Sequence, residues 1–310
     1  MTLVSVVLTT YNRRDYLREA LDSVLAQTHR SFEVIVSNDG GRDYSAPVRE
    51  RFDDRRVAWV DHKVRKGMVA NTLDGLSRAR GQYVALLHDD DRWDPELLAR
   101  LVPRLDADPA ISVAFADHFI IDQGGRVDLP QTDRNSARWG RDRLAPGVHR
   151  PFRRLAVIDG TIPIQCAAVF RRSALDVSAF PAQSGTRFDR WLSRELARGD
   201  AGAYYDPARL AYYRVHPASQ TATGGLEWAQ AGIYIFSRFL QDPELADLPR
   251  APLRAALAEA HHGAGVARIR NGEPRAARPA LARALRLNPR PRTGAAMLAS
   301  FLPASIGTRL

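Results

Sequence analysis

The chain has 310 residues, of which 45% are apolar, and a formal net charge of +10. That length and apolar content suffice for one large α/β domain with an accessory region, and they exclude a disordered chain. The one cysteine, Cys166, excludes an intrachain disulfide framework and a zinc cluster built on cysteines. Neither a signal peptide nor a membrane-spanning helix is expected, because Met1 to Leu8 lacks a basic segment and no run of roughly eighteen apolar residues occurs.

The positive charge is almost entirely arginine, because Lys63 and Lys66 are the only lysines. A basic chain can bind nucleic acid, an anionic membrane surface or phosphorylated ligands. Here the arginines are spread along the chain, which favours solvated surface charges for most of them. No lysine or arginine cluster with interleaved aromatic residues occurs, so nucleic acid is not an expected partner.

The first hundred residues alternate between short apolar runs and amphipathic stretches. Strands are predicted at 3–10, 32–41, 57–60 and 82–87. The stretches between them carry apolar residues at helical spacing, as at Leu17, Leu21 and Val24, and Asn12 is predicted to cap that first helix. This order of elements, with short connections, predicts a mostly parallel sheet with helices on both faces.

Beyond residue 110 the pattern is less regular. ISVAFADHFIID (111–122) predicts a strand, and 128–160 is predicted to be a surface loop with short helical pieces. IQCAAVFRRSAL (164–175) predicts a strand that runs into a helix, and a further helix is predicted at 187–199. AYYDPARLAYYRVHPASQ (203–220) predicts two short strands.

From about residue 226 alanine, leucine and arginine dominate and strand patterns end. EAHHGAGVARIRNGEPRAARPALARALRLNPRP (259–291) is similar to one tetratricopeptide helix pair, which cannot bury its own face alone. Residues 1–222 and 223–310 are therefore predicted to be an α/β domain and a helical C-terminal region, for which contact with a substrate or a membrane is a candidate role. Its basic, amphipathic end fits a peripheral membrane contact or ordinary helix packing.

Polar residues follow three of the predicted strands, at the end where ligands bind in such sheets. They are Thr9 to Asn12, Asn38 with Asp39, and Asp89 to Asp91. Three adjacent carboxylates repel one another, so either a solvated turn or a positive partner is required. Such a turn offers oxygen ligands to Mg²⁺ or Mn²⁺, which keep waters and a substrate diphosphate in their shell. Taken alone, the turn fits a solvated helix cap better than a metal site.

Two stretches taken together resemble the inverting glycosyltransferases of family 2, which have the GT-A fold. They are SVVLTTYNRRDYLREALDSVLAQTHRSFEVIVSNDGG (5–41) and ANTLDGLSRARGQYVALLHDDDRWDPELL (70–98). The resemblance covers residues 3 to about 125 and continues, more weakly, to about 220. It implies a Rossmann-like GT-A sheet, mixed but mostly parallel with flanking helices, and a nucleoside-diphosphate sugar as the donor.

The resemblance also implies roles for residues by their position. Asp39 would accept a hydrogen bond from the N–H of a uracil or thymine ring. The family's Asp-x-Asp pair falls on His88 and Asp90, so the chain departs from the pattern at the first position. Asp90 and Asp91 are the predicted ligands of Mg²⁺ or Mn²⁺. The other predicted nucleotide or donor contacts are Thr10, Tyr11, Asn12, Asn71, His88, Asp89, Arg214 and His216; for the last two, bonds to loop carbonyls are the alternative.

An inverting transfer also needs a base that deprotonates the acceptor hydroxyl. The acidic pair common in the family falls on Thr186 and Arg187, which are not acidic. Asp189 is the nearest carboxylate and is the predicted base. The alternative for Asp189 is a first-turn charge favoured by the helix dipole.

The resemblance and these residues together imply a metal-dependent, hexosyltransferase-type enzyme of polysaccharide biosynthesis. Its donor would be a UDP- or dTDP-sugar, and its acceptor a hydroxyl on a glycan, a lipid-linked saccharide or a natural product. The alternative, motivated by His88 and the missing acidic pair, is a catalytically inactive nucleotide-sugar-binding partner of another transferase. The expected location is cytoplasmic, with peripheral contact at the inner face of the cell membrane left open.

Overall fold

The computed structural model describes residues 1–40, 46–216 and 225–301. The chain divides into two compact units. The sheet unit comprises Met1–Phe180 and Leu192–His216, and the helical unit comprises Pro181–Trp191 and Pro217–Leu310. The predicted boundary at 222/223 lies outside the described residues. Residues 181–191, which the sequence places in the α/β domain, belong by their contacts to the helical unit.

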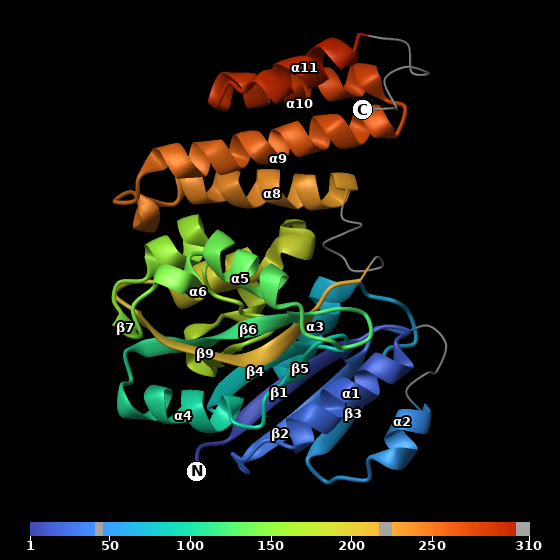
Figure 1. Ribbon diagram of the computed structural model, residues 1–310, viewed down its shortest axis with the longest axis vertical. Coiled ribbons are helices and arrows are strands. Elements are labelled where there is room, and N and C mark those ends of the chain that lie inside the picture. Colours follow the sequence, from blue (N-terminus) through green and yellow to red (C-terminus); the bar gives the residue numbers. More distant parts are fainter. Residues whose placement is uncertain (41–45, 217–224, 302–310) are drawn as a thin grey trace. The chain divides into compact units, whose positions relative to one another are not determined.

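The sheet unit is built on a sheet that has nine strands in the described part of the chain, in the order β3-β2-β1-β4-β8-β6-β9-β5, with β7 also paired to β9 (Figure 1). One direction is shared by β1 (Val4–Thr10), β2 (Phe32–Asn38), β3 (Val57–Asp61), β4 (Tyr83–His88), β6 (Ile111–Ile121) and β9 (Gly202–Arg214). The opposite direction is taken by β5 (Arg92–Trp93), β7 (Gly147–His149) and β8 (Ala168–Arg171). The prediction of a mixed, mostly parallel sheet is confirmed.

Helices cover both faces of this sheet. α1 (Arg14–Leu25) and α4 (Leu97–Ala107) share an apolar cluster with β1, in which Leu17 and Leu101 are buried with Val6. α3 (Met68–Arg78) packs on the opposite face, where a Cβ on Gly75 would lie 2.4 Å from Cγ1 of Val7. β1 is thus buried on both faces, which explains its mostly apolar, β-branched sequence. The short helix α2 (Ala46–Arg51) lies between β2 and β3 in the chain.

The chain between 111 and 216 is more regular than the sequence pattern predicts. α5 (Leu129–Arg138) occupies part of the stretch predicted as loop, and Asp128 caps it by accepting the N–H of Gln131. The two strands predicted in 203–220 are one strand, β9, whose pairing with β6 shifts register on either side of Asp117. These bulges break the two-residue alternation that marks a strand in sequence. After β8 a short 3-10 turn, Arg172–Ala174, stands where a helix is predicted.

The helical unit contains α8 (Gly225–Gln241), α9 (Arg250–Arg270), α10 (Pro274–Leu287) and α11 (Pro291–Ala299). α9 and α10 form the predicted helix pair around Gly272, whose φ is 78°. They approach closely because Gly265 has no side chain: a Cβ there would lie 2.5 Å from Cγ of Leu281. α6 (Phe188–Leu196) starts in the segment that belongs to this unit and ends in the sheet unit.

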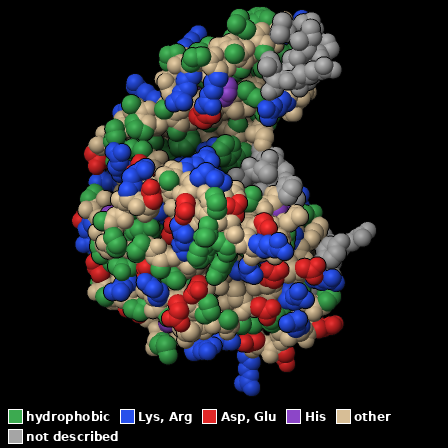
Figure 2. Space-filling view, viewed as in Figure 1, with side chains coloured by type: hydrophobic (Ala, Val, Ile, Leu, Met, Phe, Trp, Pro, Cys, Tyr) green, Lys and Arg blue, Asp and Glu red, His purple; other side chains and the backbone are tan. Residues whose placement is uncertain are grey.

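Two expectations from composition can be compared with the described residues. Within them, no helix is both long and apolar enough to cross a bilayer. The face seen in Figure 2 carries basic and acidic side chains interspersed, without one broad basic patch. On that face the arginines are scattered, as their spread along the sequence suggests.

Candidate functional site

The predicted site residues gather where parallel strands of the sheet unit end. β1 pairs in register with β2 and β4, so that Thr10 lies opposite Asn38 and Thr9 opposite His88. The end of β9 reaches the same place, because the N–H of Arg214 donates to Oδ1 of Asp91 at 2.9 Å. We call this group the strand-end site; it comprises Thr10, Tyr11, Asn12, Asp39, His88, Asp89, Asp90, Asp91, Arg214 and His216.

Asp89 is buried at the end of β4 and is held by the turn that follows β1. Its Oδ2 accepts the hydroxyl of Thr10 at 2.8 Å and the N–H of Tyr11 at 3.2 Å. Arg13 donates to its other oxygen at 3.2 Å. Burial and the neighbouring Asp90 raise the pKa of Asp89 to about 6, although Arg13 and these hydrogen bonds oppose the rise. Asp89 therefore ties β4 to the β1 turn.

Asp90 is the carboxylate with the most positive surroundings. Its Oδ2 accepts a hydrogen bond from Nη1 of Arg13 at 2.6 Å and lies 3.0 Å from Nε2 of His216. Burial alone would raise the pKa of Asp90, but His88, His216 and Arg13 together lower it. Asp90 is thus charged at neutral pH, and its side chain is 14% exposed.

Asp91 has the opposite character. It is buried, and it accepts a hydrogen bond from a backbone N–H, that of Arg214. Burial raises its pKa well above the ordinary value, and the charge of Asp90 raises it further. The fold therefore disfavours the charged form of Asp91, which reduces the repulsion among the three adjacent carboxyl groups.

His88 stands at the last position of β4, between β1 and the loop that precedes β8. Its Nδ1 lies 2.8 Å from the hydroxyl of Thr9, and its Nε2 contacts Oε1 of Gln165. Both ring nitrogens therefore have protein partners. The predicted donor contact of His88 stays a prediction.

Asn12 is not the cap of α1, so that prediction is wrong. The cap position is Arg13, whose side chain makes no capping hydrogen bond. Asn12 instead has a φ of 57°, in the left-handed region that asparagine tolerates better than most residues. The turn made there directs Arg13 to Asp89 and Asp90.

Asp39 and Asn71 organise the neighbouring β2 edge. The buried carboxylate of Asp39 accepts the backbone N–H groups of Lys66 at 2.8 Å and Gly67 at 3.1 Å. The amide of Asn71 donates to the backbone carbonyl of Ser37 at 2.9 Å and accepts the Ser37 hydroxyl at 2.7 Å. These bonds fix the loop before α3. The predicted base contact of Asp39 and donor contact of Asn71 stay predictions.

Arg214 is a buried cation rather than an exposed one. Its side chain is 1% exposed and pairs with Oε2 of Glu19 at 2.7 Å. Its Nε donates to the backbone carbonyl of Asp90 at 2.7 Å, and the ring of Tyr16 lies 4.5 Å from its guanidinium carbon. The alternative role left open by the sequence, bonding to loop carbonyls, is thus present in the structure.

Sequence reasoning missed Arg13 and Gln165 as members of this region. Arg13 contacts two of the three carboxylates, and Gln165 contacts His88. The signal for Arg13 was its place directly after the β1 turn, since an acidic turn requires a positive partner. Gln165 had no comparable signal because it lies in a long connection, 77 residues from His88.

The described residues can be tested against a divalent ion. Among them, no group of three or more His, Cys, Asp or Glu could hold a metal ion. Oδ2 of Asp90 and Nε2 of His216, however, are 3.0 Å apart. Adjacent ligands of an octahedral ion with bonds of about 2.1 Å are separated by roughly that distance. This pair therefore fits an ion whose other ligands are waters and substrate phosphates. Asp91, which is buried and accepts the backbone N–H of Arg214, fits less well.

Asp189, the predicted base, lies in the first turn of α6 within the helical unit. Burial raises its pKa above the ordinary value, while Arg190 and Arg187 oppose the rise. In the same unit the guanidinium of Arg187 lies 3.3 Å from the centre of the Trp228 ring, and burial lowers its pKa to about 10. Arg187 thus packs under α8. The catalytic role of Asp189 stays a prediction.

Several known proteins resemble this chain. It is 34% identical over 100 residues to TuaG of Bacillus subtilis, named a teichuronic acid biosynthesis glycosyltransferase; the match covers 32% of this chain and 40% of that protein. The chain spans 38 to 40% of the length of several curated relatives that it matches. Staphylococcus aureus TarS 1-349, solved in complex with UDP-GlcNAc, superposes with a TM-score of 0.66 and 17% identity over 96% of this chain and 84% of that one.

A second solved structure has the same fold. It is the mannosyltransferase PcManGT of Pyrobaculum calidifontis in complex with GDP-Man and Mn²⁺, with a TM-score of 0.61 and 22% identity over 99% of this chain and 83% of that one. These likenesses confirm the GT-A fold. The family model for glycosyl transferase family 2 matches residues 5–178. The match covers more than half of the chain, and the chain belongs to glycosyl transferase family 2.

Proposed function

We propose that the protein is an inverting, metal-dependent glycosyltransferase that uses a UDP- or dTDP-sugar and a saccharide hydroxyl as acceptor. The observation that carries this proposal is Asp90, a charged carboxylate that touches both Arg13 and His216 at the carboxyl end of β4. That edge is where ligands bind in parallel α/β sheets. The structures of similar fold that contain UDP-GlcNAc, or GDP-Man with Mn²⁺, support a nucleotide-sugar donor and a divalent ion.

Asp90 and His216 would hold the ion, and Thr10 and Tyr11 would border the nucleotide. The bound ion would supply positive charge to the diphosphate as it leaves. Arg13 is the cation already beside these carboxylates. We expect its guanidinium to exchange Asp90 for phosphate oxygens of the donor, because arginine binds phosphate with two parallel hydrogen bonds.

In the proposed reaction the acceptor oxygen forms a bond to the anomeric carbon. The bond from that carbon to the diphosphate breaks, and the diphosphate keeps the electron pair. The acceptor proton passes to the carboxylate of Asp189, which acts as the base. The raised pKa of Asp189 matches this task better than an ordinary aspartate pKa does, since a base works best near the operating pH.

The test is release of nucleoside diphosphate from a panel of UDP-, dTDP- and GDP-sugars, with Mn²⁺ and saccharide acceptors. Asp189→Asn should lower turnover by about 10²- to 10⁴-fold and leave nucleotide binding unchanged. Its matched control is Asp54→Asn, which changes a partly buried carboxylate paired with Arg56 outside the site. Full turnover in Asp189→Asn would remove the base assignment.

A second function remains as the alternative: a nucleotide-sugar-binding partner without turnover. Arg187 favours it, because the position of a family carboxylate holds a cation packed on Trp228. Nucleotide binding without turnover of any donor in the panel would establish this alternative.

As to location, we propose a cytoplasmic protein that touches the membrane through α11, where Leu298 is 73% exposed.

A further inference from the structure

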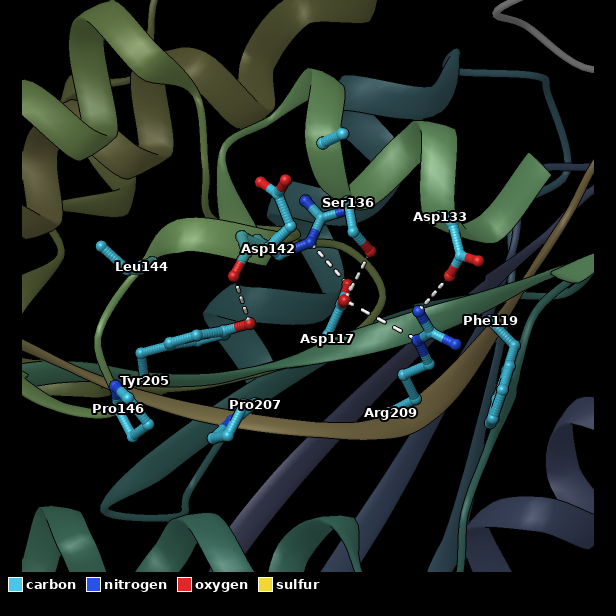
Figure 3. Close-up of a pocket in the computed structure, with 12 residues that line it drawn as sticks. Asp117, Phe119, Asp133, Ser136, Asp142, Leu144, Pro146, Tyr205, Pro207 and Arg209 are labelled. Carbon is cyan, nitrogen blue, oxygen red and sulfur yellow. Dashed lines mark hydrogen bonds and ion pairs between the residues drawn. The ribbon is translucent and has the colours of Figure 1, made fainter. Parts of the chain in front are cut away.

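A hollow lies in the sheet unit, and the residues of the strand-end site do not line it. Its volume is about 910 Å³, within the range of ligand pockets (Figure 3). α5 forms one wall, the bulged part of β6 and β9 forms the floor, and the 3-10 turn Arg141–Arg143 with the residues after it forms the other wall. We call it the α5 hollow and define it by Phe119, Asp133, Asp142, Pro146, Pro207 and Arg209.

The floor of the hollow is a buried, fully engaged carboxylate. Asp117 accepts the hydroxyl of Ser136 at 2.5 Å and Nε of Arg141 at 2.6 Å. Arg141 is 3% exposed and also donates to the backbone carbonyl of Thr161. Asp117 sits between the two register shifts of β6, and such bulges re-aim side chains. The floor is therefore rigid, and its charges compensate each other.

The accessible charges are also fixed in place. Arg209 spans the hollow between Asp133, at 2.5 Å, and Asp117, at 3.9 Å (Figure 3). Its guanidinium carbon lies 5.4 Å from the centre of the Phe119 ring. Phe119 in turn stacks on Tyr212, with ring centres 5.4 Å apart. An aromatic ring, a guanidinium and a carboxylate are thus preorganised side by side on regular elements, which position groups more accurately than loops do.

The balance of charge indicates what kind of ligand fits. Asp133 and Asp142 are 68% and 44% exposed, whereas Arg209 is 29% exposed. Asp142 is paired with Arg143 and Asp133 with Arg209, so the charges of the lining are balanced and do not favour a phosphate or another anion. Phe119, Pro146 and Pro207 add apolar surface to the same lining. A ligand with many hydroxyl groups and apolar C–H faces satisfies both kinds of surface, because hydroxyls donate to carboxylates and accept from guanidinium.

We propose that the α5 hollow binds an uncharged saccharide unit of the acceptor, separately from the nucleotide at the strand-end site. The identity of this saccharide as an acceptor rests on the proposed function, whereas its binding does not require turnover. The hollow thereby selects neutral over anionic glycans. The part of the Phe119 ring that Arg209 and Tyr212 leave uncovered supplies apolar surface, and Asp142 accepts hydrogen bonds from hydroxyls.

The test is saturation-transfer NMR of the full chain with cellobiose, maltotriose, mannobiose and diacetylchitobiose, and with trigalacturonic acid as the anionic probe. At least one uncharged probe should bind. Phe119→Ala should weaken that binding about tenfold, because the aromatic surface is lost. Asp142→Asn should weaken it about threefold without disturbing packing. In both variants the melting-temperature shift caused by UDP with Mn²⁺ should equal that of the unchanged chain.

The chain offers matched controls for both substitutions. Phe52→Ala removes another partly buried phenylalanine with an arginine over its ring, and Asp15→Asn removes another exposed, arginine-paired carboxylate. Both should bind the probe as the unchanged chain does. Binding unaffected by Phe119→Ala and Asp142→Asn, failure of every uncharged probe, or tighter binding of trigalacturonic acid would each overturn the inference. Saccharide binding in a chain that turns over no donor would overturn the proposed function alone.

Discussion

At the strand-end site three carboxylates follow one another in the chain, whereas the carboxylates of the α5 hollow, Asp117, Asp133 and Asp142, come from separate elements. In the first group burial, together with the charge of Asp90, raises the pKa of Asp89 to about 6 and raises that of Asp91 well above its ordinary value. In the second, burial would raise the pKa of Asp117, but Arg141 and Ser136 lower it overall. Excess negative charge suits a cation, and balanced charge suits a neutral ligand.

The two buried carboxyl groups, Asp117 and Asp91, should differ most in what their removal does to stability. Asp117→Asn should lower the free energy of unfolding by about 3–5 kcal/mol, because it leaves the buried Arg141 without its charged partner. Asp91→Asn should change it by less than about 1 kcal/mol, because burial and the neighbouring Asp90 raise the pKa of Asp91 and so oppose its charged form. Urea unfolding at pH 7 measures both. Equal losses of unfolding free energy in the two variants would contradict this difference between Asp117 and Asp91.

Arg13 is expected to affect the two ligands of the strand-end site in opposite ways. Arg13→Gln should weaken UDP binding in the presence of Mn²⁺ about tenfold, because a charge-assisted phosphate contact is lost. The same change should strengthen binding of Mn²⁺ alone a few fold, because Arg13 no longer competes for Oδ2 of Asp90. Titration calorimetry of each ligand separates the two effects. If both affinities fall together, Arg13 has only a structural role there.

The acid side of the stability curve tests the charge of Asp117. Its pKa in the folded chain lies below the ordinary value, so the folded state binds fewer protons there than the unfolded state. The stabilisation it gives is present above about pH 4 and is lost as pH falls through the lowered pKa. The unchanged chain should therefore lose more stability between about pH 5 and 2 than Asp117→Asn does. Parallel curves for the two proteins would show that Asp117 is not charged in the fold.

The smallest expected effect lies in the helical unit. Leu298 is exposed on α11, and arginines flank this end of the chain. Leu298→Ser should lower flotation with anionic liposomes a few fold at low salt, because one apolar contact is lost while the charges stay. Val64→Ser, at another exposed apolar residue in the sheet unit, is the control. Equal flotation of all three proteins would remove the membrane contact.

Local sequence patterns predicted the strands that meet at the strand-end site, and prediction failed where distant segments decide the structure. β1, β2 and β4 have mostly apolar runs, so their parallel pairing and the meeting of Thr10 with Asp89 could be inferred. Arg141 and Gln165 could not be inferred, because their partners lie across long connections. The same holds for β9, where bulges hide the strand pattern, and for Arg187, whose packing on Trp228 depends on α8.

In our proposal, Asp90 enables the strand-end site to bind a divalent ion together with a nucleoside diphosphate. The most direct measurement is the melting temperature of the chain with UDP, dTDP or GDP, each with and without Mn²⁺, for the unchanged protein and Asp90→Ala. Binding to the folded state alone raises this temperature by mass action. We predict a rise with UDP or dTDP that needs Mn²⁺ and is absent in Asp90→Ala. No rise with any nucleotide, or the same rise in Asp90→Ala, would contradict the account.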